Sequence, residues 1–291
     1  MPFLQARNDA VNKHPAPPTI DYPLTTRGSS WLYSVCSIYG AATLITIALS
    51  YIAKQNERIF HRIFTIAYLV GTVAYFAMGS NVGYLDALQP HQVDDNGDNR
   101  QMFWVKYVLW AVDFPLVSTA LGIASGISWA EILYNVALAW TWIICYLIGT
   151  VIGDEYRWAL YALGTLAWLL LAENTLVRGT QAAGRVGIKG DYLILAGWAN
   201  LMWFLYALGY GLTDAGNVIR VTPSFIWFGI TDLLLMLGVG FGIIVVFAPR
   251  WDYGKLNLFF TQYGRVAVQE GNFPEKDTAN NGTQQAAAPA V

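Results

Sequence analysis

Three ionisable side chains occur inside long apolar stretches of this sequence. Lys106 and Asp113 lie in FWVKYVLWAVDFPLVSTALG, and Asp232 lies near the middle of FIWFGITDLLLMLGVGFG. A charged group at the centre of a membrane costs about 3 kcal/mol on insertion scales, so each one requires a partner or a function. We predict that Lys106 is charged and pairs with Asp232, with Asp113 close by. Two acids beside one lysine would leave a net negative charge in a low-dielectric site, so we expect one acid, Asp113, to be protonated near neutral pH.

Aromatic residues accompany these groups at helical spacing. Trp110 falls on the same helix face as Lys106 and Asp113. A second stretch, WANLMWFLYALGYGLTD, carries three aromatic residues on one face: Trp203, Tyr206 and Tyr210. Turned inward, these faces would form a polar, aromatic centre and a candidate pocket. Two interpretations stay open: an ion pair that only fixes the positions of the helices, or a path for ions or protons.

The elements that position these residues are membrane-spanning helices. Hydrophobic residues make up 55% of the 291 residues and charged residues only 12%, about half the charged share of a soluble domain. Seven apolar runs reach the roughly 20 residues that a bilayer requires: 31–53, 63–85, 103–125, 130–152, 156–177, 191–213 and 222–248. Strands in lipid would leave backbone groups unpaired, so the runs are predicted to be helices.

We therefore predict an all-α membrane protein, a seven-transmembrane-helix bundle over residues 31–255. The polar, proline-rich segment 1–30 is expected to be a short and largely unstructured extracellular tail. Residues 256–291 form a cytoplasmic tail that is expected to be disordered toward its end, because it has few large apolar residues.

The charges of the short loops predict the orientation. One side of the chain carries basic loops: Lys54, Arg58 and Arg62, then Arg178, Arg185 and Lys189, then Arg250 and Lys255. The other side is more acidic: Asp86, Asp94, Asp95 and Asp98 with Arg100, then Asp154 and Glu155 with Arg157, then Asp214 with Arg220. Basic loops face the cytoplasm, so the N-terminus is expected outside and the C-terminus inside. The basic residues of segment 1–30 oppose this only weakly.

Several function classes lack sequence support. The chain has no basic block that would indicate a nucleic-acid partner. Its three histidines and two cysteines stand at no metal-ligand spacing, so no metal site is expected. We find no Ser/His/Asp set and no nucleotide motif, so we do not expect an enzyme.

Over nearly all of residues 30–255 the sequence resembles the microbial (type I) rhodopsins, most closely their fungal branch. The segment YFAMGSNVGY (75–84) is similar to a Tyr-x-x-Met…Gly-Tyr segment of that family, and Trp110 with Pro115 matches its Trp-x-x-x-x-Pro spacing. In the sixth run, Trp203, Tyr206 and Tyr210 match the spacing of the aromatic residues that line the family's retinal pocket, although a Trp is typical at the position of Tyr210. In the seventh run, Asp232, Gly238 and Gly240 are similar to the family's Asp-x-x-x-Lys-x-Gly-x-Gly motif.

The departures from the family concern its chemistry. The family holds retinal as a Schiff base on a lysine, and the matching position is Met236, or Gly238 in a shifted alignment. A thioether cannot form an imine, so no Schiff-base retinal cofactor is expected. Lys106 matches the family's outer-side Arg and is expected to be a member of an ion pair. The proton-acceptor and proton-donor carboxylates of the pumps are replaced by Leu109 and Ala120, which removes the relay that a pump requires.

This combination resembles the lysine-lacking opsin-related proteins of fungi, which include stress-induced heat-shock proteins of the plasma membrane. The resemblance implies a multi-pass plasma-membrane protein that acts as a stress-associated regulator or interaction protein. Its implied partners are the lipid bilayer, other membrane proteins such as a proton ATPase, and a possible homo-oligomer. Two alternatives remain: an ion or proton channel or transporter that uses Lys106, Asp113 and Asp232, and a sensor that binds retinal or another apolar ligand non-covalently.

Overall fold

The computed structural model describes residues 8–53, 58–89 and 99–251. Within these residues, seven helical segments are long and apolar enough to cross a membrane. Their helices are α2 (Thr26–Ile52), α3 (Arg58–Gly79), α4 (Trp104–Ser125), α5 (Trp129–Val151), α6 (Tyr156–Glu173), α8 (Lys189–Tyr210) and α9 (Val221–Phe241). The prediction of a seven-helix membrane bundle is confirmed.

Three of the spans continue beyond their α-helix through a π-helical turn. Helix α6 continues through η1 (Asn174–Gly179) into α7 (Thr180–Val186), and α8 continues into η2 (Gly211–Ala215). Helix α9 continues through η3 (Gly242–Phe247) into the 3-10 turn η4 (Ala248–Arg250). Such turns insert an extra residue into a helix and re-aim the side chains that follow.

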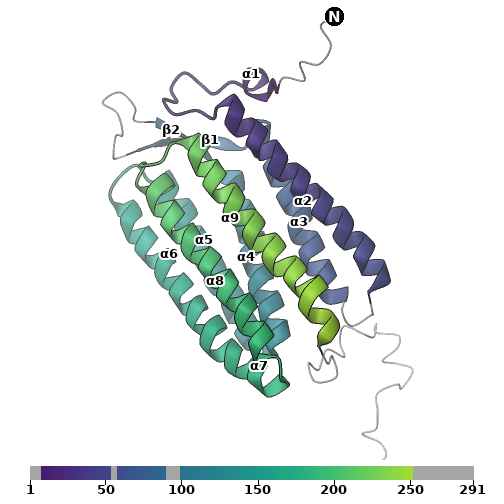
Figure 1. Cartoon of the computed structure of the whole chain (residues 1–291). Coiled ribbons are helices and arrows are strands. Elements are labelled where there is room, and N and C mark those ends of the chain that lie inside the picture. The colour runs from purple at the N-terminus through teal and green to yellow at the C-terminus, as the bar shows by residue number, and fades with distance from the viewer. Residues whose placement is uncertain (1–7, 54–57, 90–98, 252–291) are drawn as a thin grey trace, which may run out of the picture.

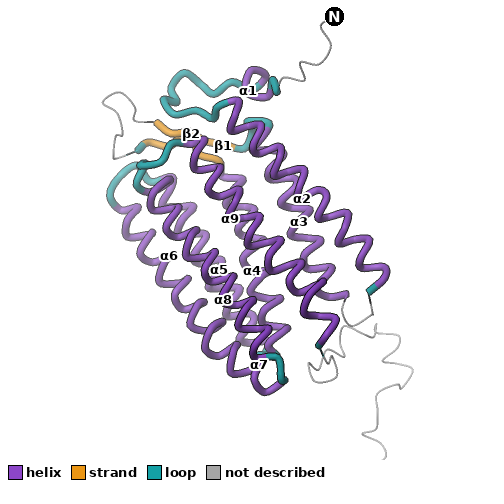
Figure 2. Tube along the Cα trace, viewed as in Figure 1, coloured by secondary structure: helices purple, strands orange, loops and turns teal. Residues whose placement is uncertain are grey.

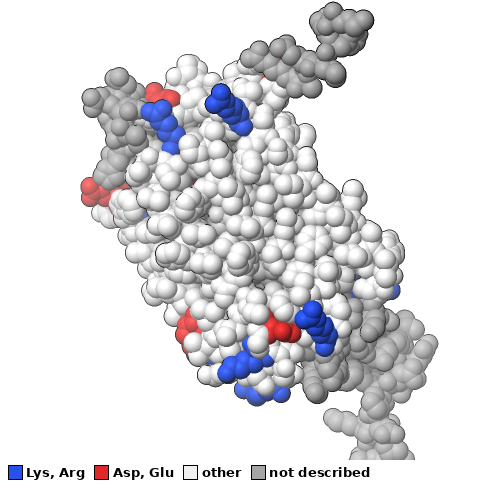
Figure 3. Space-filling view, in the orientation of Figure 1, with Lys and Arg blue, Asp and Glu red and all other residues white. Residues whose placement is uncertain are grey.

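The helices run side by side, with the short elements gathered at the two ends (Figure 1). Helix α4 touches α3, α5, α8 and α9, and it has the most buried span of the seven. It therefore places Lys106, Trp110 and Asp113 inside the bundle. Charged side chains lie at the two ends of the face drawn in Figure 3, and an uncharged band separates them, as expected for a protein surrounded by lipid.

A two-stranded antiparallel sheet covers one end of the bundle (Figure 2). Strand β1 (Tyr84–Leu88) pairs with β2 (Asn99–Phe103), with Tyr84 opposite Phe103. The second span was expected to reach residue 85, but α3 ends at Gly79. Two positive φ angles, 58° at Asn81 and 78° at Gly83, turn the chain out of the helix and into the strand.

The expectation of an unstructured N-terminal tail is wrong for the described residues 8–25. They include a helical turn, α1 (Ala10–Lys13), and a segment that packs on the sheet, where Tyr22 forms a parallel bridge with Arg100. The backbone N–H of Leu24 donates to Gln101 Oε1 over 2.7 Å, and Leu24 is buried. Backbone pairing and apolar burial therefore order this segment. The predicted C-terminal tail 256–291 lies outside the described residues.

Glycines of α9 and of the turn η3 that follows it set how closely the neighbouring helices approach. A Cβ atom on Gly238 would lie 2.5 Å from the indole nitrogen of Trp198, and one on Gly242 would lie 3.2 Å from Leu195. A Cβ atom on Gly240 would lie 2.9 Å from the Phe64 ring and would also strike the Tyr68 hydroxyl. Three neighbouring glycines thus let α3 and α8 pack against the α9 backbone, as small residues do between membrane helices.

Candidate functional site

A buried ion pair joins α4 to the end of the sixth span. The Lys106 ammonium donates to Asp214 Oδ2, and the Tyr107 hydroxyl donates to the same oxygen over 2.7 Å. The Arg100 Nε lies 3.8 Å from Asp214 Oδ1. All four side chains are buried. The predicted pair of Lys106 with Asp232 is therefore wrong: the partner is Asp214, which was expected to lie in a loop.

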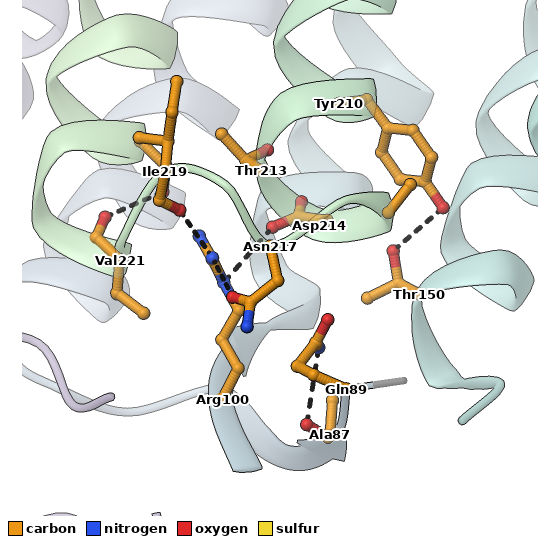
Figure 4. Close-up of polar contacts among 12 residues, drawn as sticks. Ala87, Gln89, Arg100, Thr150, Tyr210, Thr213, Asp214, Asn217, Ile219 and Val221 are labelled. Carbon is orange, nitrogen blue, oxygen red and sulfur yellow. Dashed lines mark hydrogen bonds and ion pairs between the residues drawn. The ribbon is translucent and has the colours of Figure 1, made fainter. Parts of the chain in front are cut away.

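Arg100 fixes this acid from the sheet side. In Figure 4 its guanidinium extends from β2 toward the loop that follows η2. Its Nη1 donates to Asn217 Oδ1 over 2.9 Å and to the Ile219 carbonyl over 2.6 Å. Burial lowers the pKa of the Arg100 guanidinium, and Asp214 opposes that shift. An arginine starts so far above neutral pH that it stays charged.

A second buried arginine, Arg157 at the start of α6, ties three helix ends and the sheet together. Its Nε donates to the Ile152 carbonyl over 3.0 Å, and its Nη1 donates to Gln89 Oε1 and to the Ala215 carbonyl over 2.8 and 3.2 Å. Ile152 caps the C-terminal end of α5, and Ala215 ends η2. Carbonyls at such ends are unpaired, and the helix dipole favours a cation there. Arg157 therefore has a structural role here and is not a loop charge.

Asp232 on α9 is held by neutral donors from three helices. The hydroxyl of Tyr75 on α3 donates to its Oδ2, and the hydroxyl of Tyr206 on α8 donates to its Oδ1. The indole nitrogen of Trp110 on α4 donates to Oδ1 over 3.1 Å. Both carboxyl oxygens are thus satisfied without a directly bonded cation, which fixes the rotamer of Asp232 and the spacing of four helices.

Trp110 also connects the two carboxylate sites. The Lys106 ammonium lies 5.2 Å from the centroid of the Trp110 ring, a distance typical of a cation–π contact. The nitrogen of the same indole donates to Asp232. Lys106 thus lies over the ring of Trp110 and Asp232 lies at its nitrogen, and the two residues are not bonded to each other.

Asp113, the third predicted member of the centre, is buried but unsatisfied. Neither of its carboxyl oxygens has a hydrogen-bond partner among the described residues. The buried hydroxyl of Tyr39 on α2 is likewise without a partner in that part of the chain. Asp113 lies close enough to Tyr39 and Asp232 for their charges to interact. Two orphaned polar groups in one region form a place that can take up a proton or water.

Aromatic rings fill the middle of the bundle around Phe114, one residue beyond Asp113. The ring centroid of Phe114 lies 4.8 Å from that of Tyr206, 4.9 Å from that of Trp142 and 6.1 Å from that of Trp203. Trp203 and Tyr206 therefore face this centre. Tyr210 does not share it, because its ring stacks on Tyr146 at 3.9 Å, toward α5.

Met236 is fully buried on α9, one turn after Asp232. Its backbone carbonyl accepts a hydrogen bond from the Tyr68 hydroxyl over 3.0 Å. Tyr68 in turn lies against Gly240 and stacks on Phe241 at 5.8 Å. Aromatic side chains of α3 thus hold this part of α9 in place.

Sequence reasoning missed Asp214, although a signal was present. Asp214 follows Tyr210 by four residues, so it continues the face of Tyr206 and Tyr210 for one more turn. The predicted end of the sixth span at residue 213 hid this pattern. The structure extends the span through η2 to Ala215.

A second group that was missed is uncharged. Asn135 on α5, Asn174 in η1 and Asn200 on α8 are all buried, and Asn174 donates to Asn135. Asn200 donates to Thr175 Oγ1 over 3.0 Å. Each of the three side chains keeps one amide atom without a partner among the described residues. Single asparagines scattered in apolar runs give no pattern that a sequence can reveal.

The fold and the centre define a seven-helix membrane protein in which a carboxylate of the last helix is clamped by tyrosines of the second and sixth spans. The family profile described as "Bacteriorhodopsin-like protein" matches residues 26–250. The chain belongs to this family.

Curated relatives from fungi are similar over most of the chain. Protein FDD123 of Trametes versicolor is 30% identical, covering 93% of this chain and 92% of its own. Opsin-like protein carO of Fusarium fujikuroi is 27% identical over 78% and 77% of the two chains. The 30 kDa heat shock protein of Saccharomyces cerevisiae is 25% identical over 78% and 74%.

Solved structures confirm the fold. The light-driven proton pump LR (Mac) from Leptosphaeria maculans superposes with a TM-score of 0.74 at 23% identity, over 82% of this chain and 100% of its own. At that identity the similarity defines the fold and leaves the activity open.

Proposed function

We propose that this protein is a non-photochemical opsin-related membrane protein that works without covalently bound retinal. The observation that carries the proposal is the composition of α9. Residues 221–250 contain no lysine, and Met236 stands one turn after Asp232, where the resembled family carries its Schiff-base lysine. A Schiff base requires a primary amine, which methionine lacks.

The residues of the bundle centre do not favour a retinal imine. The buried amine of helix α4, that of Lys106, is already bound by Asp214. The ring of Phe114 lies among those of Trp142, Trp203 and Tyr206 at van der Waals spacing. These contacts support a centre filled by the protein's own side chains.

The test is to mix purified protein with all-trans retinal and to record the visible spectrum before and after borohydride treatment. We expect no red-shifted band and no retinal trapped on the protein. A trapped product would overturn the proposal. A red-shifted band would overturn it as well, because that band requires a protonated imine. Bound retinal with an unshifted band and no trapped product would instead favour a sensor that binds retinal non-covalently.

The variant Met236→Lys separates the missing amine from the filled pocket. If the amine alone is missing, this variant forms a trapped retinal adduct, with Asp232 as the acid one turn away. If the pocket is also filled, only the double variant Met236→Lys/Phe114→Ala forms one. Either result supports the proposal, provided that the unmodified chain forms none.

We further propose that the protein acts by interaction in the plasma membrane, as a stress-associated regulator, and not as an enzyme. One of its relatives bears the name heat shock protein. Proximity labelling in living cells before and after heat stress tests the role, with a proton ATPase and a second copy of this chain as the expected partners. Equal labelling of all abundant membrane proteins under both conditions would contradict it.

A proton or ion path is the second candidate, and the state of Asp113 favours it. A buried carboxyl that has no hydrogen-bond partner among the described residues can accept and pass on a proton. Proteoliposomes that contain a pH-sensitive dye measure such a flux. Flux through the protein that Asp113→Asn abolishes would establish this function, and the absence of flux would leave the interaction role.

A further inference from the structure

Outside the polar centre, an apolar groove of about 450 Å³ runs between α8 and α9. It is lined by Leu193, Gly197, Trp198, Leu201, Gly238 and Phe247, among others. Leu193, Trp198 and Leu201 are exposed on the outside of the bundle. The groove volume falls in the roughly 300–1,000 Å³ range of small-molecule sites, and in a membrane-spanning region its surroundings are lipid.

The groove is built by the contact of one indole with the neighbouring helix. The Trp198 nitrogen donates to the Leu234 carbonyl over 2.8 Å, which lays the ring across α9. Gly238 makes this possible, because a Cβ atom there would lie 2.5 Å from that nitrogen. At Gly197 a Cβ atom would meet no heavy atom within 4 Å. The wall is therefore fixed by a hydrogen bond, and the space over Gly197 is open.

Two exposed basic residues stand at one end of this groove. Lys189 precedes Leu193 by one turn of α8, and Arg250 follows Phe247 by one turn, so both extend the lining faces. Asp191, two residues after Lys189, accepts a hydrogen bond from the Trp251 indole over 3.1 Å and keeps its negative charge, so the two basic side chains exceed one acidic side chain. At the lower end of the face shown in Figure 3, Lys and Arg side chains outnumber the acidic side chains that lie among them.

We propose that this groove binds one anionic phospholipid of the surrounding bilayer, with an acyl chain over Gly197 and the phosphate between Lys189 and Arg250. The apolar wall matches a hydrocarbon chain, and the two cations match a headgroup that carries net negative charge. From Lys189 to Leu201 the helix rises about 18 Å, at 1.5 Å per residue, so one lipid can span from the basic end to the far end of the groove. A sterol, which carries only a neutral hydroxyl, would leave both cations unused.

Native mass spectrometry of the purified full chain tests this, with phosphatidylserine and phosphatidylcholine of identical acyl chains as probes. We expect the chain to retain phosphatidylserine in preference to phosphatidylcholine. Each basic residue near an anionic lipid contributes about fivefold in affinity. The double variant Lys189→Gln/Arg250→Gln should therefore lose the preference while it still binds both lipids weakly.

A variant that fills the groove provides a second test of the proposal. Gly197→Leu places a side chain in the open space and should reduce the retained phosphatidylserine at least fivefold. Ala137→Leu, which adds a leucine at an exposed position of α5, is the matched control and should change nothing. Equal binding of the two lipids by the unmodified chain, equal binding by Gly197→Leu and Ala137→Leu, or displacement of phosphatidylserine by a sterol would each overturn the proposal.

Discussion

Lys106 on α4 donates to Asp214, in the π-helical turn after α8, and not to Asp232 on α9. Two of the three buried acids therefore have separate partners: Asp214 has cations, and Asp232 has two tyrosines and a tryptophan. This division places the buried ion pairs of the described residues at the end covered by the sheet. In the middle of the bundle, uncharged donors hold Asp232 among packed rings.

We predict that Lys106→Met lowers the stability of the protein by about 3 kcal/mol or more, because it leaves the Asp214 carboxylate buried and unpaired. Unfolding in detergent, followed by circular dichroism, measures the loss. Lys13→Met at an exposed position is the control and should stay within about 0.5 kcal/mol of the unmodified chain.

The same variant identifies the partner of Lys106. Adding Asp214→Asn to Lys106→Met should recover part of the lost stability, because it removes the stranded charge. Adding Asp232→Asn should recover none. The reverse pattern of recovery would show that Asp232 is the partner.

Two stacked tyrosines, with ring centroids 5.4 Å apart, provide a matched pair of variants. Tyr75→Phe removes a hydroxyl that donates to Asp232, so it should cost about 1–3 kcal/mol. Tyr39→Phe removes a buried hydroxyl without a partner among the described residues and should be nearly neutral. An equal loss for both would mean that a water molecule satisfies Tyr39.

The close approach of α3 to α9 predicts a strong effect of one methyl group. Gly240→Ala should lower stability by about 1–3 kcal/mol, because the new Cβ atom strikes Phe64 and the Tyr68 hydroxyl. Gly197→Ala should raise stability by up to about 1 kcal/mol, since its Cβ atom meets nothing and alanine favours the helix. Adding Tyr68→Phe to Gly240→Ala should recover part of the loss. Equal stability of the two alanine variants would contradict the packing.

Asp113→Asn should change stability by less than about 1 kcal/mol if Asp113 carries a proton, because the amide replaces a neutral acid of the same shape. Infrared difference spectra between the unmodified chain and the variant should then show the loss of one protonated carboxyl band. A large loss of stability without any carboxyl band would mean that Asp113 is ionised and has a partner such as bound water.

The predicted orientation places the sheet outside the cell and α7 in the cytoplasm. In sealed cells, a tag at the N-terminus should be accessible to antibody, and a tag at the C-terminus should be protected until the membrane is permeabilised. Finding both tags on one side would contradict the odd number of spans. Finding them exchanged would contradict the orientation alone.

The sequence by itself determined the bundle, because span length, apolar content and local capping are properties of neighbouring residues. Ser128 and Glu131, for example, begin α5 with a reciprocal capping box that their spacing alone specifies. The absence of a lysine from α9 is likewise a fact of the sequence. The membership of Lys106, Trp110, Asp113, Trp203, Tyr206 and Asp232 in the interior followed from helical periodicity.

Only the tertiary structure decided which of these residues bond to one another. Asp214 and Asp232 lie on different helical segments. Which of them bonds to Lys106 depends on how far each helix is displaced along its axis and on the π-helical turn that extends the sixth span. The same holds for Arg100 and Arg157, which were expected in loops and are buried in the fold. Arg100 contacts the Asp214 side chain and the Ile219 carbonyl, and Arg157 contacts the Ala215 carbonyl at the end of η2. Helix periodicity fixes the face on which a side chain lies. The depth and the partner come from packing between segments that are distant in the chain.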